Sequence, residues 1–573
     1  MRREHFGICS VAFAVLGLLA VSAPAAVITV SGTGDAIAVD AAATLREAII
    51  SMNNQGDVNA DVTGKRLGIY ATLPGGTADV INFNIAGSGV RTISATSAEP
   101  TIVVPLTING YSQAGAAANS LANADNAVIR IQLDGIGAGA NVTGLTLGAG
   151  SGGSVVKGLD IVRFAGDGIL VLSDGNSILG NFIGVDPSGT TRMPNGTFPN
   201  SGDGIRLVSA SNNQIGSAAP ADRNIASGNA LNGIHLVGSI AAPVTANKIQ
   251  GNFVGVAADG KSSVGTRTEP APAPGTAEGN NLGGIEVSGG ELNAVGGTAA
   301  GTRNVVGFNG LGIQLDNGAQ QNAIQGNFSG VGADGVTGAG NLLQGIALRS
   351  SNGFSVPLGP AQASEPGVSF NLIGGTAAGA GNLVEFNGAA GVAVFGNPVS
   401  ASGQPNVGNA IEGNGIFEDG RSAPATRLGI DLTNGFTFPS EDGATANDSK
   451  GHGAANDPNN FQNAPELTMV RSDAGQTKIA GSLTQSASPN STFRIEFFAS
   501  DPDPLGVHAE GQQFLGFFNA STDAGGVASF APTLPVSVAV GRIVTATATD
   551  QLGNTSEFSE GVAGDTIFTD DFE

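Results

Sequence analysis

The sequence predicts an all-β protein whose central part is a parallel β-helix, and three observations support this prediction. Two short phrases, G-I-x-L and G-N-F-x-G, recur between residues 168 and 431, and internal repeats of this kind are typical of stacked structural units. Each G-I-x-L places one outer position between two apolar ones and is bounded by Gly, Asn, Asp and Ser, as in a strand between turns. No stretch of this region sustains a helical period of about 3.6 residues.

The repeats indicate two kinds of coil that alternate along the axis. The first phrase begins at Gly168, Gly204, Gly233, Gly284, Gly312, Gly345, Gly391 and Gly429. G-N-F, or the degenerate Gly413-Asn414, follows every other copy, and N-x-x-G stands between these positions. The coils average roughly 37 residues, which lies within the range of solenoid repeats.

Residues 1–25 are expected to be a signal peptide. Two arginines precede an apolar run at about residues 11–21, and A-P-A at residues 23–25 is a small-residue cleavage pattern. The run is too short to span a bilayer. Because the single cysteine, Cys9, lies in this segment, the exported chain must be stabilised by packing rather than by disulfides.

Residues 26–140 are expected to hold an N-terminal cap and the first rungs of the β-helix. Thr44 and Glu47 have capping-box spacing, and the apolar residues between 44 and 50 fall on one face of a short helix. Such a helix suits the open end of a solenoid, which exposes core and unpaired backbone. Strands are predicted at residues 27–30, 79–85, 91–96 and 101–108.

The rest of the chain divides into four parts. These are the repeats at 141–435, a linker at 436–464, an immunoglobulin-like β-sandwich at 465–562 and an acidic tail at 563–573. The linker is rich in turn-forming residues, and seven strand-like runs follow it, as in an immunoglobulin-like domain. Phe493, Ile495 and Phe497 alternate with polar residues, which indicates a strand with one buried face.

The composition excludes several classes of protein. The 90 glycines have no G-x-y period, which excludes collagen, and the 41% hydrophobic content is too high for a disordered chain. A formal net charge of -23 would repel phosphate backbones. Neither nucleic acid nor an anionic lipid surface is therefore an expected partner, and no transmembrane segment is expected in the mature chain.

Several segments occur in an order that carries a resemblance. They are T-L-R-E-A-I at 44–49, V-I-N-F at 80–83, L-T-I-N-G at 106–110 with Gln113, and then the repeats. This series resembles the bacterial exported β-helix proteins named for a C-S-L-R-E-A motif, with Ala43-Thr44 in place of the usual Cys-Ser. E-G-Q at 510–512 and G-N-T-S-E-F at 553–558 are similar to the sandwich that ends other members.

The resemblance implies a right-handed, pectin-lyase-like β-helix outside the cell or at its surface, and it implies no agreed chemistry. The general rule for parallel crossovers also favours the right-handed form. The final I-F-T-D-D-F-E is similar to tails of some exported bacterial proteins, with Asp571 where those tails have glycine. A sorting role for this tail is a hypothesis, and a frayed acidic end is the alternative.

The middle residue of each G-I-x-L is expected to point out of the coil, since alternate residues of a strand face opposite sides. Stacking then predicts one outward column in the natural groove of the fold: Leu170, Arg206, His235, Glu286, Gln314, Ala347, Ala393 and Asp431. Arg206, His235 and Glu286 are the candidate catalytic residues, because a lyase needs a strong base beside carboxylates or Ca²⁺. Gln314 and Asp431 are candidate ligand-binding residues. A solvated strand face without function would show the same residue types.

The asparagines of the G-N phrase are interpreted as a structural ladder: Asn181, Asn252, Asn327 and Asn414. Equivalent Asn residues at a bend can bond the backbone of neighbouring coils, and Asn tolerates left-handed conformations. The aspartates that follow them are interpreted as turn residues: Asp186, Asp259, Asp334 and Asp419. In the linker, Asp442, Asp448 and Asp457 are candidate Ca²⁺ ligands, although the D-x-D-x-G pattern of the resembled family is interrupted there.

Two functions fit the sequence. Regular coils, scarce charge and the absence of a compact polar constellation favour an exported, non-enzymatic scaffold or adhesin-like module that presents a surface to polysaccharides or other cell-surface components. The alternative is a polysaccharide lyase or glycoside hydrolase acting near Arg206, His235 and Glu286. The lack of Trp and the presence of only two Tyr argue against this alternative. No cofactor is expected to be required, and Ca²⁺ is the one left open.

Overall fold

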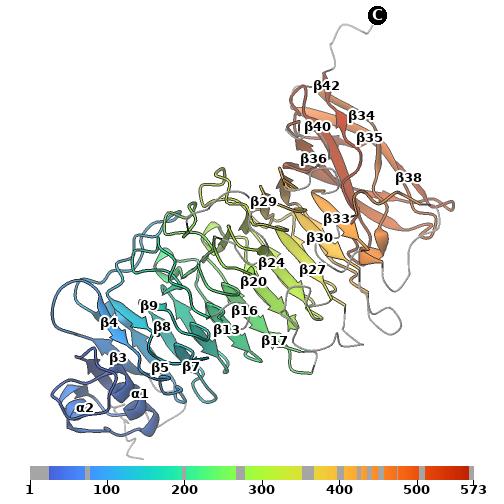
Figure 1. The fold of residues 1–573 in the computed structure, drawn as a ribbon. Helices are drawn as coiled ribbons and strands as arrows, with labels where there is room; N and C mark the ends of the chain where they lie inside the picture. The colour runs from blue at the N-terminus through green and yellow to red at the C-terminus, as the bar shows by residue number, and fades with distance from the viewer. Residues whose placement is uncertain are drawn as a thin grey trace, which may run out of the picture.

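The computed structural model describes residues 25–70, 78–196, 202–239, 241–265, 278–350, 367–396, 405–421, 428–434, 442–448, 457–473, 475–502 and 510–566. These residues form one elongated body (Figure 1). The helices α1 (Leu45–Asn54) and α2 (Ala60–Lys65) lie at one end, and two mainly antiparallel sheets lie at the other. Residues 1–24 of the predicted signal peptide and residues 567–573 of the predicted tail lie outside the described residues.

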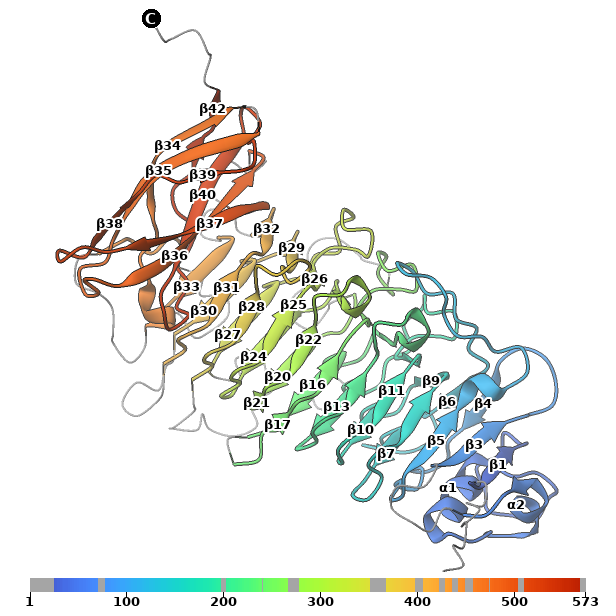
Figure 2. The ribbon, with the colours of Figure 1, turned by 180° about the vertical axis from the view of Figure 1, so that it is seen from behind.

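Three long sheets run between these two ends (Figure 2). The first is 12-stranded and holds β1 (Val27–Val30), β2 (Arg66–Leu67), β3 (Asp79–Phe83), β5 (Leu106–Asn109), β8 (Val155–Lys157), β11 (Ser177–Leu179), β14 (Gln214–Ile215), β18 (Lys248–Ile249), β22 (Ala294–Gly296), β25 (Ala323–Gln325), β28 (Leu372–Gly374) and β31 (Ala410–Glu412). The second is 9-stranded and holds β7 (Leu145–Leu147), β10 (Ile169–Val171), β13 (Ile205–Val208), β16 (Ile234–Val237), β20 (Gly283–Ser288), β24 (Leu311–Asp316), β27 (Ile346–Arg349), β30 (Val392–Phe395) and β33 (Ile430–Thr433).

The third sheet is 10-stranded and completes each coil. It holds β4 (Arg91–Ser94), β6 (Ile131–Asp134), β9 (Leu159–Val162), β12 (Phe182–Ile183), β15 (Ile225–Ala226), β19 (Phe253–Val254), β23 (Val305–Val306), β26 (Phe328–Ser329), β29 (Leu383–Glu385) and β32 (Gly415–Phe417). Short elements at the corners are β17 (Val244–Thr245), β21 (Gly290–Glu291), η1 (Gly110–Ser112), η2 (Pro220–Asp222) and η3 (Ala300–Thr302). Neighbouring strands of the three sheets are parallel, except that β2 is antiparallel to β1. The chain is therefore an all-β parallel solenoid, as the sequence predicts.

The coils turn apolar side chains from the three sheets into a shared core. In the second sheet these include the residues after the repeated glycine, which stack in register from Ile169 through Ile205 to Ile234 and are fully buried. The core is continuous from Ile28 in β1 to Leu432 in β33. Because each coil buries its apolar residues against the coils next to it, the stack is stabilised by nearest-neighbour contacts.

The two kinds of coil differ in what they place on the outer face of the third sheet. Coils with G-N-F put a phenylalanine there, and Phe182 and Phe253 belong to a second hydrophobic cluster outside the coil. In the intermediate coils Ile225, Val305 and Leu383 take the register position of the phenylalanine, and two of these coils place an arginine against a phenylalanine of the following coil. The Arg223 guanidinium lies 4.2 Å from the ring centre of Phe253, and that of Arg303 lies 3.8 Å from Phe328. Cation–π contacts therefore join neighbouring coils of the two types at two places.

The aspartates after the G-N phrase hold turns, as predicted, in three of four cases. The Asp259 carboxylate accepts the backbone N–H of Lys261 at 3.0 Å and of Ser262 at 2.8 Å. Asp186 and Asp334 cap equivalent turns. These carboxylates therefore have structural partners within their own loops.

The predicted asparagine ladder is present, and from Asn181 to Asn414 it includes an asparagine from each coil rather than from every second one. It runs in the order Asn181, Asn224, Asn252, Asn304, Asn327, Asn382 and Asn414, with each Nδ2 donating to the next Oδ1 at 2.9 to 3.2 Å. Each Nδ2 also donates to a backbone carbonyl of another coil, as Asn252 does to Ile215 at 2.8 Å. The buried amides are thus satisfied within the stack.

Two further ladders, which the sequence analysis missed, occupy the other corners of the coil. One contains Asn176, Asn213, Asn247, Asn293, Asn322, Asn371 and Asn409. The other contains Asn195, Asn229, Asn280, Asn309, Asn341 and Asn387 and ends on Asp419, whose Oδ1 accepts from Asn387 at 2.9 Å. Burial raises the pKa of Asp419 well above its usual range. This aspartate, predicted to be a turn residue, therefore replaces an asparagine as the last member of a ladder.

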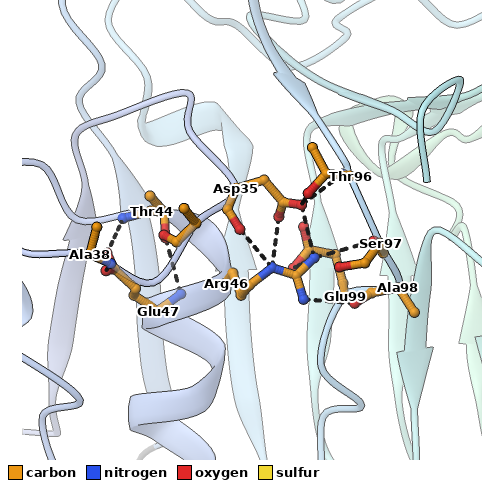
Figure 3. A network of polar contacts seen from close by, with 10 residues as sticks. Asp35, Ala38, Thr44, Arg46, Glu47, Thr96, Ser97, Ala98 and Glu99 are labelled. Carbon is orange, nitrogen blue, oxygen red and sulfur yellow. Dashed lines mark hydrogen bonds and ion pairs between the residues drawn. The ribbon is translucent and has the colours of Figure 1, made fainter.

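The N-terminal cap is fixed by the predicted capping box and by Arg46. Thr44 Oγ1 accepts the Glu47 N–H at 3.2 Å, and Glu47 Oε2 accepts the Thr44 N–H at 2.9 Å. Arg46 Nε donates to Asp35 Oδ1 at 2.8 Å, and the same guanidinium donates to two carbonyls in the loop after β4 (Figure 3). One side chain therefore ties α1 to two loops of the first coils.

We expect Arg46→Lys to weaken the first coils by about 2 kcal/mol, because an ammonium cannot reproduce the planar fork that reaches the carboxylate and both carbonyls. Native-state hydrogen exchange should show faster exchange in α1, β3 and β4 with little change beyond β13, since coils of a solenoid contact only their neighbours. Arg471→Lys, at an exposed position, is the matched control. Unchanged exchange in α1 would contradict this role for Arg46.

The chain ends in a domain of two mainly antiparallel sheets, which we call the two-sheet domain. One sheet holds β34 (Glu466–Asp473), β35 (Gln476–Thr484), β38 (Val527–Phe530), β39 (Thr533–Leu534) and β42 (Asp565–Thr566), and the other holds β36 (Thr492–Ser500), β37 (Gln513–Ser521), β40 (Ile543–Thr549) and β41 (Val562–Ala563). Both contribute to one core, which includes Ile479, Phe493 and Phe497.

The two-sheet domain covers the open edge of the last coil. Glu510 accepts the backbone N–H groups of Glu418 and Asp419 at 2.9 and 3.2 Å, and Glu557 accepts that of Leu432 at 3.0 Å. Further N–H groups of this coil donate to Glu496, Asn554, Thr555 and the carbonyl of Gly511. The edge that would otherwise pair with another chain is therefore capped by side chains and by one backbone carbonyl of the two-sheet domain.

Part of the predicted linker also closes this end. Residues 458–461 form η4 (Pro458–Phe461). Asn459 Oδ1 accepts the Asn409 N–H at 3.1 Å, which extends one ladder by a residue, and Phe461 joins the main core. Residues 436–441 and 449–456 of the predicted linker lie outside the described residues.

Candidate functional site

The strand register of the second sheet places the predicted outward residues in one column. Arg206 pairs with Leu170 on one side and with His235 on the other, and His235 pairs with Glu286. Gln314, Ala347, Ala393 and Asp431 continue the column in that order. The three candidate catalytic residues thus lie on successive strands β13, β16 and β20.

Only one end of this column is accessible. The side chain of Arg206 is 38% exposed, that of His235 16% and that of Glu286 10%. Gln314 and Asp431, predicted to be ligand-binding residues in an open groove, are buried. Ala347 and Ala393 belong to a hydrophobic cluster on the outer face of this part of the sheet. An open groove along the whole column was therefore the wrong expectation, because apolar side chains cover its second half.

Asp203, which the sequence analysis did not select, organises the accessible end. Its Oδ2 lies 2.8 Å from His235 Nδ1 and 3.9 Å from Arg206 Nε. Its Oδ1 accepts both the backbone and side-chain N–H of Asn232 at 3.0 Å. The neighbouring Asp167 accepts the Asp203 N–H at 3.0 Å. Asp167, Asp203 and Asn232 all stand directly before the glycine of G-I-x-L, and this recurring polar position was the signal that could have identified them.

Glu286 connects this end to the buried half of the column. Its Oε1 lies 3.7 Å from His235 Nε2, and its Oε2 accepts from Asn232 Nδ2 at 2.7 Å. Gln314 donates to Glu286 at 3.3 Å and to Asp316 at 2.6 Å, and Arg349 donates to Gln314 at 2.6 Å. The polar side chains of the column therefore bond mainly to one another.

The protonation states of the cluster follow from burial and neighbouring charge. Burial opposes the charge of the imidazole, but the Glu286 and Asp203 carboxylates outweigh it and raise the pKa of His235 to about 9. Burial would raise the pKa of Asp203, but the charge and hydrogen bond of His235 lower it below its usual range. Burial and the charge of Asp203 raise the pKa of Asp167. At neutral pH the cluster therefore holds a His235 imidazolium beside an Asp203 carboxylate.

This arrangement limits the chemistry that the column can perform. An imidazolium can donate a proton but cannot accept one, so His235 is unsuited to be the general base of a lyase at neutral pH. Asp203 is ionised but its side chain is only 1% exposed, which restricts direct contact with a substrate. Arg206 is the side chain of the cluster with the largest exposed fraction.

We expect stability to fall by about 3 kcal/mol through His235 as the pH rises from 6.5 to above 9. The imidazole has an unfolded pKa of about 6.5 and a folded pKa of about 9, so its contribution is fully present below the first value and is lost as the pH passes the second. Urea unfolding of the protein and of His235→Gln across this range isolates the effect from other titrating groups. Parallel pH profiles for the two proteins would rule out the imidazolium.

The candidate Ca²⁺ ligands are only partly brought together. Asp442 and Asp457 line one pocket of about 350 Å³, together with Asn434, Thr445 and Phe461. Asp448 is not among the lining residues, and its backbone N–H donates to Asn463. Within the described ranges no group of three or more His, Cys, Asp or Glu side chains is arranged to hold a metal ion. Among the described residues, two of the three predicted ligands therefore share a pocket and the third does not line it.

Comparison with known proteins adds no family assignment. No protein-family model and no curated protein matches the chain. None of the helices in the described part of the chain is long and apolar enough to cross a membrane.

Proposed function

We propose that this protein is an exported, non-enzymatic β-helix protein that acts as a rigid extracellular or cell-surface scaffold. In this proposal the coils wind right-handed, as the crossover rule favours, and the two-sheet domain is an immunoglobulin-like sandwich. The exposed surface of the rod would contact polysaccharides or other cell-surface components. It requires no cofactor, although Ca²⁺ near Asp442 and Asp457 would be compatible with the proposal.

The observation that supports this proposal is a solenoid with hydrogen-bonded side-chain ladders along its length and capping groups at its ends. Buried asparagine ladders stand at all three corners of the coils, and capping groups occupy both ends. Hydrogen-bonded side-chain ladders resist bending and local opening because every amide would lose partners at once. A rod of fixed length is what a scaffold needs, and a catalytic groove does not require it.

A second candidate function is a polysaccharide lyase or glycoside hydrolase at Arg206, His235 and Glu286. The partly exposed guanidinium of Arg206 beside a carboxylate and an imidazolium favours it, because such a group can bind an acidic sugar and stabilise developing negative charge. The mutual pairing of the other polar groups disfavours it.

The two functions differ in a direct test. The mature protein is incubated with pectate, alginate and glycosaminoglycans, with and without Ca²⁺, and new reducing ends and unsaturated products are measured. The scaffold predicts no products for any substrate, with retained binding to one or more glycans on an array and equal binding by Arg206→Ala. Products that disappear in Arg206→Ala, while the thermal unfolding of the variant is unchanged, would replace the scaffold with the enzyme.

Cell fractionation tests the export part of the proposal. We expect the protein in the extracellular or cell-surface fraction of its host. Recovery of the folded protein from the cytoplasm alone would overturn export independently of the activity result.

A further inference from the structure

The first strand of the solenoid begins where the predicted signal peptide ends. The A-P-A pattern at residues 23–25 predicts cleavage after Ala25, so Ala26 becomes the first residue of the mature chain. Ala26 directly precedes β1 and is fully buried, and its carbonyl accepts the Val80 N–H at 2.8 Å. The new N-terminus would thus lie inside the first coil.

The backbone nitrogen of Ala26 faces a buried carboxylate. It donates to Asp79 Oδ1 at 2.8 Å, and Asp79 is only 1% exposed. The register that pairs Val27 with Val80 fixes the two groups beside each other. Because Asp79 begins β3 and Ala26 precedes β1, the parallel pairing of these strands holds the contact in place.

Cleavage changes the charge on this nitrogen. Hydrolysis adds one water across the Ala25–Ala26 peptide bond and leaves a carboxylate on Ala25 and an amino group on Ala26. An α-amino group has a pKa of about 7.7 to 8.0 and is therefore mostly protonated at neutral pH. A neutral amide donor then becomes an ammonium, which adds a Coulomb attraction to the Asp79 carboxylate that an uncharged N–H does not make.

We propose that removal of the signal peptide creates a buried ion pair between the Ala26 ammonium and the Asp79 carboxylate, and that this pair locks the first coil. The inference rests on the export proposed above. It also sets an order of events, because a bond next to a fully buried residue must be cut before the first coil closes. The precursor carries the uncharged amide contact, and its Ala25 forms an isolated bridge with the exposed Ile69.

The test compares chains that differ only at this contact. One chain begins at Ala26, released from a removable N-terminal fusion, and the other carries a Gly-Ser extension before Ala26; each is made with Asp79 and with Asp79→Asn. We expect the Val80 amide, which donates to Ala26, to exchange about tenfold more slowly in the mature chain than in the extended one. This difference should vanish in the Asp79→Asn pair, which lacks the negative charge.

A second measurement does not depend on the variants folding. The pKa of the Ala26 amino group, obtained from the pH dependence of its acylation, should lie about one unit above that of an unpaired α-amino group. The advantage of the mature chain should be present below about pH 7.7 and disappear as the pH rises through this elevated value, because the ammonium is then lost. An unshifted amino pKa, or equal Val80 exchange in mature and extended chains, would overturn the ion pair.

The processing step is tested separately on protein exported by its host. Mass spectrometry of the N-terminus should give Ala26 as the first residue. A different first residue would contradict the proposed cleavage between Ala25 and Ala26, even if cell fractionation supports export. Failure of the ion pair in the purified mature chain would leave the scaffold proposal intact, so the two outcomes are distinguishable.

Discussion

Replacing Asn252 by alanine is expected to lower the free energy of unfolding by about 4 kcal/mol. Asn252 is fully buried in the middle of its ladder. Its Oδ1 accepts the side-chain amide of Asn224, and its Nδ2 donates to Ile215 O and to Asn304 Oδ1. Alanine removes all of these bonds and leaves a gap, while the neighbouring Asn224 and Asn304 are fully buried and cannot reach solvent to replace the lost partners.

The loss of stability in Asn252→Ala should first affect the coils next to Asn252 and then spread along the solenoid. Hydrogen exchange is expected to accelerate in the coils that contain β14, β18 and β22, and urea unfolding should begin there, since adjacent coils supply each other's hydrogen bonds. Asn123→Ala, at an exposed position, is the control and should change stability by less than about 0.5 kcal/mol. A cost at Asn252 no greater than at Asn123 would show that the ladder does not stabilise the solenoid.

The ladders also show how far the sequence predicts this fold. G-N-F identified Asn181 and its counterparts in every second coil because phenylalanine marks those positions. Asn224, Asn304 and Asn382 stand at the same corner of the intermediate coils, but an arginine or glycine precedes them and no phenylalanine follows. The hydrogen-bonding role of an asparagine depends on the corner of the coil that it occupies. The sequence alone does not show which asparagines share a corner, because inserts of unequal length separate equivalent positions of successive coils.

The sequence predicted which residues share the outward column of the candidate site, but it did not predict their protonation states or their exposure. Alternation within G-I-x-L places Arg206, His235 and Glu286 on one face in the correct order. It does not reveal that Asp203, which lies before its strand, reaches sideways to His235 and holds it as an imidazolium. Nor does it reveal which part of the face is covered, because Ala347 and Ala393 are buried in a cluster with Leu311 and Phe395 that forms only when neighbouring coils stack.

Segments that carry the family resemblance turn out to contribute to the ends of the solenoid. T-L-R-E-A supplies the capping box and Arg46 at the first end. E-G-Q and G-N-T-S-E-F contain Glu510, Gly511, Asn554, Thr555 and Glu557, which accept backbone N–H groups of the last coil. The repeats need only apolar residues and asparagines, whereas an end has unpaired backbone that must meet specific acceptors. This difference explains why the recognisable motifs lie at the ends.

The largest effect is therefore expected at the C-terminal cap. The double substitution Glu510→Ala and Glu557→Ala removes the acceptors of the Glu418, Asp419, Leu432 and Thr445 N–H groups. We expect the docking of the two-sheet domain to weaken by about 5 kcal/mol, since each buried N–H left without an acceptor costs roughly 1 to 3 kcal/mol. The exposed edge of β31, β32 and β33 should then pair with other molecules.

Light scattering and hydrogen exchange measure the two consequences together. The double variant should form concentration-dependent assemblies, and the amides of Glu418, Asp419 and Leu432 should exchange faster while the core of the two-sheet domain stays protected. The control is Glu466→Ala with Glu560→Ala, which removes two carboxyl groups from exposed positions of the same domain and should remain monomeric. Assembly by both variants would attribute the effect to lost negative charge, whereas assembly by the first alone means that the two-sheet domain keeps the solenoid from growing end to end.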